Sequence, residues 1–394
     1  MVALSGGTSY FCTEASDSPN LARSFVDAVP RASRTCSLPF AVTCSSESRS
    51  PVRQFTAFRP RTYWLPKLEI DPARIKTAMV WGLGILLMVL AILITVTIGW
   101  RPVVGARVRP LTDRKFERTP QRLAHGKYLV EGVLGCFDCH SQLASGELKA
   151  GEAPAFTDRG AGRIVIQKGN FLLAAPNITS DTDTGAGTWT DDQFARAIRE
   201  GVGHDGRTLF PMMPYEDFRY LSDEDLASVI VYMRSLPPIH NELPKPRIPF
   251  PLSRLINSAP QPIERAVTVD DSNAVVRGRY LTEVGGCKYC HAPTDKANRP
   301  LPGMDFAGGK QIDKFPAVSA NITPEATGIS YYDEALFIRA LRTGHVGARP
   351  LNPPMPWWNF RNMTDDDLKA IFAYLRTVKP VHHRVDNEER ATKM

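Results

Sequence analysis

The strongest hydrophobic feature of the chain is one continuous apolar run. Residues 78–100 contain no charged side chain, and Trp81 and Trp100 stand near the two ends. A helix of this length crosses a bilayer at 1.5 Å per residue, and interfacial tryptophans are typical of such spans. A cleaved signal peptide is the alternative, but the run is longer than a signal core and no clear small-residue cleavage site follows. We therefore expect one uncleaved transmembrane helix over residues 78–100.

Beyond this run, apolar residues recur with a helical period. Residues 190–193 form a capping box, and the apolar side chains that follow fall on one helix face. Two later segments share this pattern of an acidic start followed by apolar residues three and four positions apart. The residues concerned are Phe194, Ala197 and Ile198, then Leu226, Val229, Ile230 and Met233, then Leu368, Ile371, Phe372 and Leu375. Strand-like alternation is scarce, so we predict an all-α protein.

These helical segments belong to an internal repeat. Five motifs occur twice in the same order, and the first copy has the longer stretch between its second and third motifs. The pairs are Gly126-Lys-Tyr-Leu129 with Gly278-Arg-Tyr-Leu281, Cys136-Phe-Asp-Cys139-His140 with Cys287-Lys-Tyr-Cys290-His291, Asn177-Ile-Thr179 with Asn321-Ile-Thr323, Pro211-Met-Met-Pro214 with Pro353-Pro-Met-Pro356, and Ser222-Asp-Glu-Asp-Leu226 with Thr364-Asp-Asp-Asp-Leu368. The pattern indicates a duplicated domain with one variable loop.

The second motif of each copy carries the chemistry. Two thiols three positions apart can each form a thioether with a vinyl group of one haem, and the adjacent histidine then reaches the iron. We therefore expect two covalently bound haem c groups. Cys136, Cys139, Cys287 and Cys290 are the predicted covalent anchors, and His140 and His291 are the predicted axial ligands.

The opposite face of each iron needs a donor for electron transfer. Met213 and Met355 stand the same number of residues before their final helices, and prolines flank both. Methionine ligation favours reduced iron, so we predict these two as second axial ligands and Met212 as a packing residue. Each methionine can also be read as an ordinary core filler. The competing ligands are His204 and His345, which occupy nearly matched positions in Gly-rich turns.

Composition places the chain among globular proteins and sets its domain boundaries. The net charge is +7, and more than half of it lies before the apolar run, so nothing indicates nucleic-acid binding.

Prolines are frequent in the stretch between the repeats, which favours an extended, semi-rigid linker without a helix. The expected boundaries are a disordered extension over 1–77, the membrane helix over 78–100, a tether over 101–119, the first haem domain over 120–238, the linker over 239–274, the second haem domain over 275–380 and a tail over 381–394.

Basic residues flank the apolar run about equally on both sides, so they do not indicate which end of the chain faces the cytoplasm. The haem motifs indicate it instead. Haem c is attached on the outer side of the bacterial inner membrane. The haem domains are therefore predicted to be periplasmic, behind a single-pass anchor. The three remaining cysteines, Cys12, Cys36 and Cys44, receive no role.

The order of these motifs resembles class I cytochrome c domains in tandem. Residues 120–380 are most similar to the cytochrome c subunit of membrane-bound alcohol and gluconate dehydrogenases, through Pro176-Asn-Ile-Thr179, Trp189-Thr-Asp-Asp-Gln-Phe194, Arg199-Glu-Gly201, Asp205-Gly-Arg207, Pro211-Met-Met-Pro-Tyr215 and the linker 243–251. That family usually has three haem motifs, and its anchor does not precede the haem domains. One span before two such domains resembles instead the di-haem subunit of a haem–copper terminal oxidase.

The resemblance implies an electron carrier and not an enzyme. Single electrons would pass from a periplasmic or membrane-bound dehydrogenase, or from quinol, to an acceptor cytochrome or oxidase. Two alternatives stay open. One is a di-haem peroxidase-like enzyme, which requires an iron with an open or displaceable ligand, and the other is a terminal-oxidase subunit.

Overall fold

The computed structural model describes residues 71–144, 148–296, 298–312 and 318–385. Nearly all of the extension expected over residues 1–77 lies outside this part of the chain, as do Cys12, Cys36 and Cys44. The apolar run forms helix α1, Pro72–Thr97, and no residue of this helix is buried against the rest of the described chain. It is the one helix in the described ranges that is long and apolar enough to cross a membrane, with a mean hydropathy of 2.7.

Helix α1 is offset from the predicted span toward the N-terminus. Asp71 caps it by accepting a hydrogen bond from the amide of Ala73 at 2.9 Å, and Pro72 suits the first helical position. Residues 72–77, which the sequence assigned to the extension, are therefore helical. The helix ends at Thr97 because Gly99 adopts a left-handed conformation, with φ of +70°.

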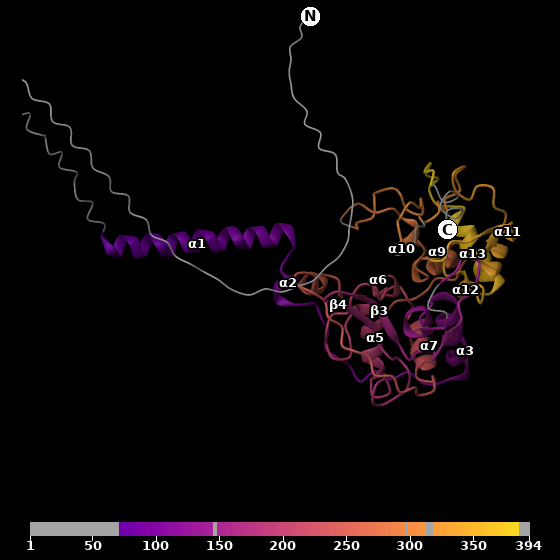
Figure 1. The fold of residues 1–394 in the computed structure, drawn as a ribbon, viewed down its shortest axis with the longest axis horizontal. Coiled ribbons are helices and arrows are strands. Elements are labelled where there is room, and N and C mark those ends of the chain that lie inside the picture. The colour runs from indigo at the N-terminus through magenta and orange to yellow at the C-terminus, as the bar shows by residue number, and fades with distance from the viewer. Residues whose placement is uncertain (1–70, 145–147, 297, 313–317, 386–394) are drawn as a thin grey trace, which may run out of the picture. The chain divides into compact units, whose positions relative to one another are not determined.

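The two repeats contain the same order of helices, and Figure 1 shows the elements of each repeat grouped together. The first repeat has α3 (Pro120–Tyr128) with a π-helical turn η1 (Leu129–Val133), α4 (Phe137–His140), α5 (Asp191–Glu200), α6 (Tyr215–Phe218) and α7 (Asp223–Met233). The second has α9 (Ala274–Val284), α10 (Cys287–His291), α11 (Glu334–Thr343), α12 (Trp357–Phe360) and α13 (Asp365–Leu375). The capping box at Thr190 and the caps at Ser222 and Thr364 start their helices as predicted.

In each repeat the first and last helices pack closely, α3 on α7 and α9 on α13. A glycine lies at each crossing. A Cβ atom on Gly126 would stand 1.9 Å from the carbonyl oxygen of Ser228, and one on Gly278 would stand 1.8 Å from that of Ala370. In both copies of the first motif a glycine is thus required, because the backbones of the two helices are too close for a Cβ atom.

Helices predominate, but the described residues also form three two-stranded antiparallel sheets. Strands β1 (Gln142–Leu143) and β2 (Phe156–Thr157) pair, as do β3 (Arg163–Lys168) and β4 (Phe171–Ala175), and β5 (His345–Val346) and β6 (Arg349–Pro350). The first two hairpins occupy the longer loop of the first repeat. The all-α expectation therefore describes the helical framework and misses these hairpins.

The linker is not wholly extended, which corrects the prediction that its prolines exclude a helix. Arg247 pairs through its backbone with Leu172 of β4, and the chain then forms α8 (Leu252–Leu255) and a 3-10 turn η2 (Ile256–Ser258). No proline stands between Pro251 and Pro260. The fixed φ of Pro251 also suits the start of a helix, so a short helical segment forms in this gap.

The repeats contact one another through reciprocal side chains. Tyr128 of the first repeat donates a hydrogen bond to Asp367 in α13, and Tyr280 of the second donates one to Asp225 in α7. Buried side chains of both repeats also belong to one continuous apolar cluster, which includes Leu129, Leu226, Leu281 and Leu368. The two repeats are therefore packed as one body rather than separated along the linker.

Candidate functional site

The first cysteine motif forms a tight helical turn that fixes the direction of its histidine. Cys136 precedes α4, Cys139 lies within it and His140 ends it. The Nδ1 atom of His140 lies 2.7 Å from the carbonyl oxygen of Pro176. A carbonyl only accepts hydrogen bonds, so Nδ1 carries the proton and Nε2 keeps its lone pair for a metal. Burial lowers the pKa of His140, which favours this neutral form.

The second motif repeats this geometry. His291 ends α10, and its Nδ1 atom lies 2.7 Å from the carbonyl oxygen of Ala320. Burial again lowers the pKa of the ring. A hydrogen bond that orients a ligating imidazole through its second nitrogen is typical of metal-binding histidines. In both histidines the contact at Nδ1 leaves Nε2 available for coordination, as the prediction requires.

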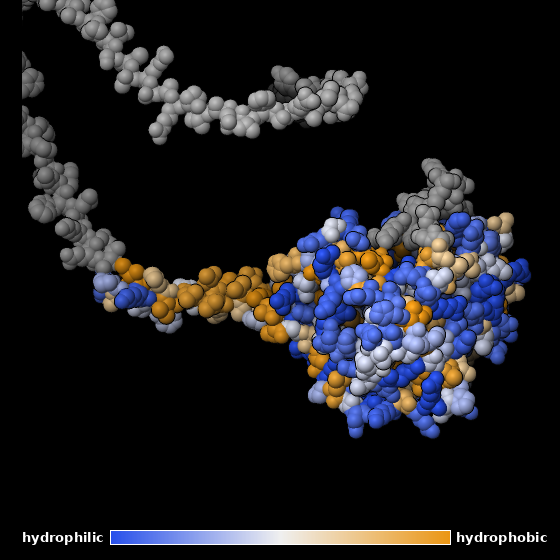
Figure 2. All heavy atoms as spheres, turned by 60° about the horizontal axis from the view of Figure 1, so that its bottom comes forward, coloured by the Kyte–Doolittle hydropathy of each residue, from blue (hydrophilic) through white to orange (hydrophobic). Residues whose placement is uncertain are grey.

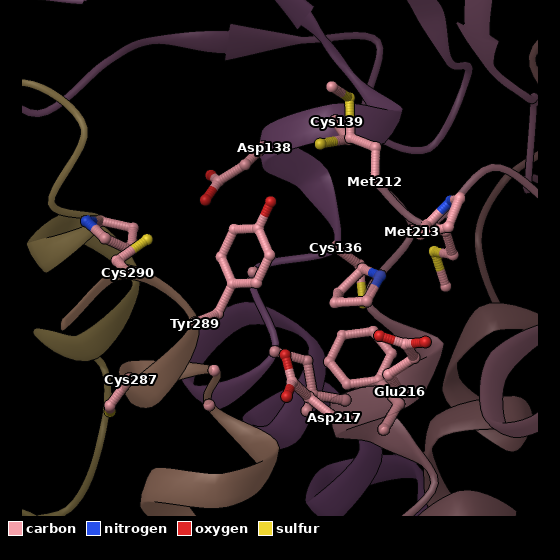
Figure 3. Close-up of a pocket in the computed structure, with 18 of the residues that line it drawn as sticks. Cys136, Asp138, Cys139, Met212, Met213, Glu216, Asp217, Cys287, Tyr289 and Cys290 are labelled. Carbon is pink, nitrogen blue, oxygen red and sulfur yellow. The ribbon is translucent and has the colours of Figure 1, made fainter. Parts of the chain in front are cut away.

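The four cysteines are free thiols that line the cavity next to these histidines (Figure 3). Burial, with a smaller effect from neighbouring charge, raises the pKa of Cys136 and of Cys287 to about 12. Burial thus disfavours a thiolate at these two positions. No disulfide competes for them within the described residues.

The Asn-Ile-Thr motif holds the carbonyl that orients each histidine. The side-chain oxygen of Asn177, which follows Pro176, accepts hydrogen bonds from the amide and hydroxyl of Thr179 at 3.0 and 2.7 Å. Its side-chain nitrogen donates to the carbonyl of Ile239 at 2.7 Å. Asn321 makes the same bonds with Thr323 and Val381. Both asparagines are buried, which favours a structural role for the motif.

The two predicted methionine ligands lie in matched turns. The amide of Met213 donates to the carbonyl of Phe210 at 3.1 Å, and the amide of Met355 donates to that of Asn352 at 3.0 Å. In both turns the methionine carbonyl accepts from the amide two residues later, at 2.8 Å. Both side chains are partly buried against the core and line the cavity; Met212 also lines the cavity but is 38% exposed.

One cavity brings both sets of residues together. Its volume is about 1560 Å³, and its lining includes both cysteine motifs, both histidines and both methionines. Pockets for a single drug-sized ligand measure about 300–1,000 Å³, so this space is large enough for two such groups. The donor set of paired thiols, a neutral imidazole and a thioether on each side fits a covalently held haem.

The competing histidines are placed differently. His204 lines the cavity but stacks on Trp189 with ring centroids 4.4 Å apart, and its side chain is exposed. His345 lies on β5 with Nδ1 2.9 Å from the carbonyl of Thr343, and it is not among the lining residues. Neither ring has the matched position that Met213 and Met355 share.

Sequence reasoning assigned no role to His125, which stands directly before the first repeated motif. The Nε2 atom of His125 lies 2.6 Å from a carboxylate oxygen of Asp225, and Arg277 occupies the same place against Asp367 in the second repeat. His125 therefore contacts the same aspartate that Tyr280 reaches from the other repeat. Asp225 and Asp367 recur at one position of the repeat, as do Tyr128 and Tyr280, which is the signal that could have predicted the contact.

Asp138, within the first cysteine motif, is a second residue that sequence reasoning missed. Its carboxylate accepts hydrogen bonds from Trp358 at 2.9 Å and from Asn359 at 2.5 Å, both on α12 of the second repeat. Burial raises the pKa of Asp138 to about 6, although these hydrogen bonds oppose the rise. The haem-attachment turn of one repeat is thus joined directly to the helix that follows the other repeat's methionine.

The family description "Cytochrome c" matches residues 123–237, the stretch that contains α3 to α7. Residues 123–237 form a cytochrome c domain. A cytochrome c domain implies covalently attached haem c, and Cys136, Cys139 and His140 lie inside the matched stretch.

The cytochrome c domain has relatives among the subunits of respiratory dehydrogenases. The chain is 32% identical over 240 residues to the cytochrome c subunit of a quinone alcohol dehydrogenase from Gluconacetobacter polyoxogenes, covering 56% of this chain and 51% of that one. It is 30% identical to the cytochrome c subunit of gluconate 2-dehydrogenase from Pantoea cypripedii, covering 64% of this chain and 58% of that one. The predicted resemblance to these subunits is confirmed.

A third relative has a more similar extent. A diheme cytochrome c-type protein from Cereibacter sphaeroides is 27% identical over 257 residues, covering 63% of this chain and 83% of that one. The chain spans about half the length of the alcohol dehydrogenase subunit, so the activity of that complex is not transferred to it. The comparisons agree with the two-motif reading and support an electron-transfer role.

Proposed function

We propose that this protein is a membrane-anchored, periplasmic di-haem cytochrome c that transfers single electrons. Its donor would be a dehydrogenase or quinol, and its acceptor a respiratory cytochrome or oxidase. The observation that carries the proposal is the duplicated geometry. In each repeat a cysteine pair, a histidine oriented at 2.7 Å by a backbone carbonyl and a methionine in a matched turn line one cavity.

A bound haem would supply the one-electron chemistry, and the residues of this chain would set its conditions. The cysteines hold the group covalently, and the backbone carbonyls of Pro176 and Ala320 orient the two imidazoles. Met213 and Met355 would each supply a thioether to one iron, which would favour its reduced form and leave no position open to a substrate. A site with both axial positions filled suits electron transfer better than peroxide chemistry.

The contact between the repeats suggests a route for the electron. Trp358 lies three residues after Met355 and donates to Asp138, which stands between Cys136 and Cys139. The turn that contains Met355 and the turn of the first cysteine motif are thus joined by hydrogen bonds from Trp358 and Asn359 to Asp138. This short connection supports transfer between two haems within the same chain.

The anchoring rests on α1. Its 26 residues and exposed apolar side chains suit a bilayer span, and a periplasmic location follows from haem c attachment. The dehydrogenase subunits to which the chain is similar suggest a dehydrogenase as the donor complex.

The proposal is tested by spectroscopy on the purified full-length protein together with identification of what co-purifies from membranes. We expect two haems per chain, low-spin iron and a methionine-to-iron charge-transfer band from each oxidised haem. A high-spin iron with peroxide turnover would instead favour the peroxidase-like alternative. Co-purification of a haem–copper core would favour the oxidase-subunit alternative over a dehydrogenase partner.

A further inference from the structure

The segment that follows α1 and a distant part of the linker meet on one face of the protein. Helix α2 (Arg101–Val104) begins four residues after the last residue of α1 and contacts α8 and the η2 turn. Pro102 of α2 and Ile256 of η2 are buried. Two stretches separated by the whole first repeat are therefore packed against each other directly beside the foot of α1.

The outer side of this contact is apolar. The exposed fractions are 56% for Val103, 68% for Val104, 83% for Phe250 and 41% for Leu255. We name these four residues the juxtamembrane patch. Figure 2 shows apolar surface on α1 and on the adjoining edge of the globular part. Single exposed apolar residues are ordinary, but a cluster of them marks a surface that binds something.

Basic residues predominate around the juxtamembrane patch. The exposed Glu242 and Glu264 flank the stretch 243–260, and Glu264 pairs with Arg107 at 3.2 Å. Lys245, Arg247 and Arg254 are exposed, and no acidic residue occurs from Leu243 to Pro260. Arg101, also exposed, is the first residue of α2. Apolar side chains bordered by basic ones are typical of surfaces that lie in the headgroup region of an anionic bilayer.

The chain geometry places this surface at the bilayer. Three residues separate Thr97 from Arg101, and an extended chain spans about 3.5 Å per residue, so α2 lies within roughly 15 Å of the end of α1. The headgroup region on one side of a bilayer is about 5–8 Å deep, and interfacial helices lie within it. Because α8 packs on α2, Phe250 and Leu255 are held near the same level.

We propose that the juxtamembrane patch lies on the anionic lipid surface of the membrane that α1 spans, an inference that rests on the proposed anchoring. The same elements border the first haem site. Arg254 and Asn257 line the cavity, and Asn257 accepts a hydrogen bond at 2.8 Å from Thr208, on the loop that leads to Met213. With the patch on the lipid surface, the part of the first haem site that Arg254 and Asn257 line faces the bilayer. A quinol or a membrane-bound dehydrogenase would deliver electrons from this side.

The test is photo-crosslinking of the full-length holoprotein in nanodiscs. The lipid is phosphatidylglycerol with a photoactivatable group close to its headgroup, mixed with phosphatidylcholine, and adducts are located by mass spectrometry of tryptic peptides. Trypsin cuts after Arg247 and Arg254, which isolates Phe250 on the peptide Ile248–Arg254. The control is the peptide Asn362–Lys369, which includes Asp366, whose side chain is 96% exposed on α13.

We expect lipid adducts on α1 and on Ile248–Arg254, and a background signal on Asn362–Lys369. Replacing Phe250→Asp together with Leu255→Asp should abolish the adducts on Ile248–Arg254 while the α1 adducts and the haem spectrum stay unchanged. Adducts on α1 without adducts on Ile248–Arg254 would overturn the juxtamembrane patch and leave the anchor intact. A lack of adducts on α1 would overturn the anchor itself.

Discussion

Substitution of the two crossing glycines gives a quantitative test of the repeated fold. In Gly126→Ala the new methyl group would stand 1.9 Å from the carbonyl oxygen of Ser228, whereas ordinary contacts begin at 3.4 Å. Helix α3 must therefore move about 1.5 Å from α7, because neither backbone atom can rotate away. The same argument applies to Gly278→Ala, where the distance to the oxygen of Ala370 is 1.8 Å.

The expected decrease in the free energy of unfolding follows from the contacts that are lost when α3 moves away from α7. Overpacked sites cost about 1–3 kcal/mol, and a gap of even 1 Å forfeits up to about half of a contact's attraction. Leu129 and Val130 next to the crossing are fully buried, so the upper end of that range applies. The better helix propensity of alanine returns up to about 1 kcal/mol. We expect a net loss of about 2–3 kcal/mol, or roughly 4–12 °C in the unfolding midpoint of the single body that the two repeats form.

The assay is thermal unfolding of the full-length protein, followed by circular dichroism in one detergent. Gly132→Ala is the matched control, because its methyl group would stand 3.6 Å from the nearest atom and should change the midpoint little. Gly278→Ala should behave like Gly126→Ala if the second repeat has the same helix crossing. Equal midpoints for Gly126→Ala and Gly132→Ala would refute the reasoning from backbone contact.

Three further outcomes follow from the contacts described above. Met355→Ala should lower the reduction potential of one haem and leave its covalent attachment intact. As a control, Met212→Ala should leave both potentials unchanged in a redox titration. If the titration of Met355→Ala is also unchanged, Met355 is not a ligand. Tyr280→Phe should lower the free energy of unfolding by about 1–3 kcal/mol in urea titrations, because the buried Asp225 carboxylate loses a donor; an unchanged midpoint would show that the contact between repeats contributes nothing. Burial raises the pKa of Asp225, but hydrogen bonds from His125 and Tyr280 outweigh burial and hold this pKa below its usual value. The ionised carboxylate therefore stabilises the fold at pH values above the unfolded pKa of 3.8. This stabilisation is lost as the pH falls through the lower pKa of the folded state. Asp225→Asn should therefore flatten the loss of stability in acid, and an identical acid-unfolding curve would contradict this assignment.

Local sequence predicted the features that depend on neighbouring residues. The turn that carries His140, the caps at Thr190 and Ser222 and the duplicated order of motifs need only a few consecutive positions, so each was readable without the fold. The Asn-Ile-Thr motif was likewise visible in the sequence, since it recurs at the same place in both repeats.

The features that sequence reasoning missed depend on residues far apart in the chain. Trp358 reaches Asp138 across the two repeats, and no local pattern at either position indicates a partner. The β3–β4 hairpin was overlooked because the apolar alternation of Arg163–Lys168 is short and falls in a loop that differs between the repeats. The prolines of the linker favour an extended chain, but the stretch between Pro251 and Pro260 contains none, and a short helix forms there through contacts with distant residues of α2.

The central claim is that two haems, each held by one histidine and one methionine, carry single electrons through this chain. A potentiometric titration of the purified full-length protein, followed by visible spectra, tests it most directly. The account predicts two one-electron transitions, with a methionine-to-iron charge-transfer band disappearing as each haem is reduced. A single transition, or a haem that lacks this band when oxidised, would contradict it.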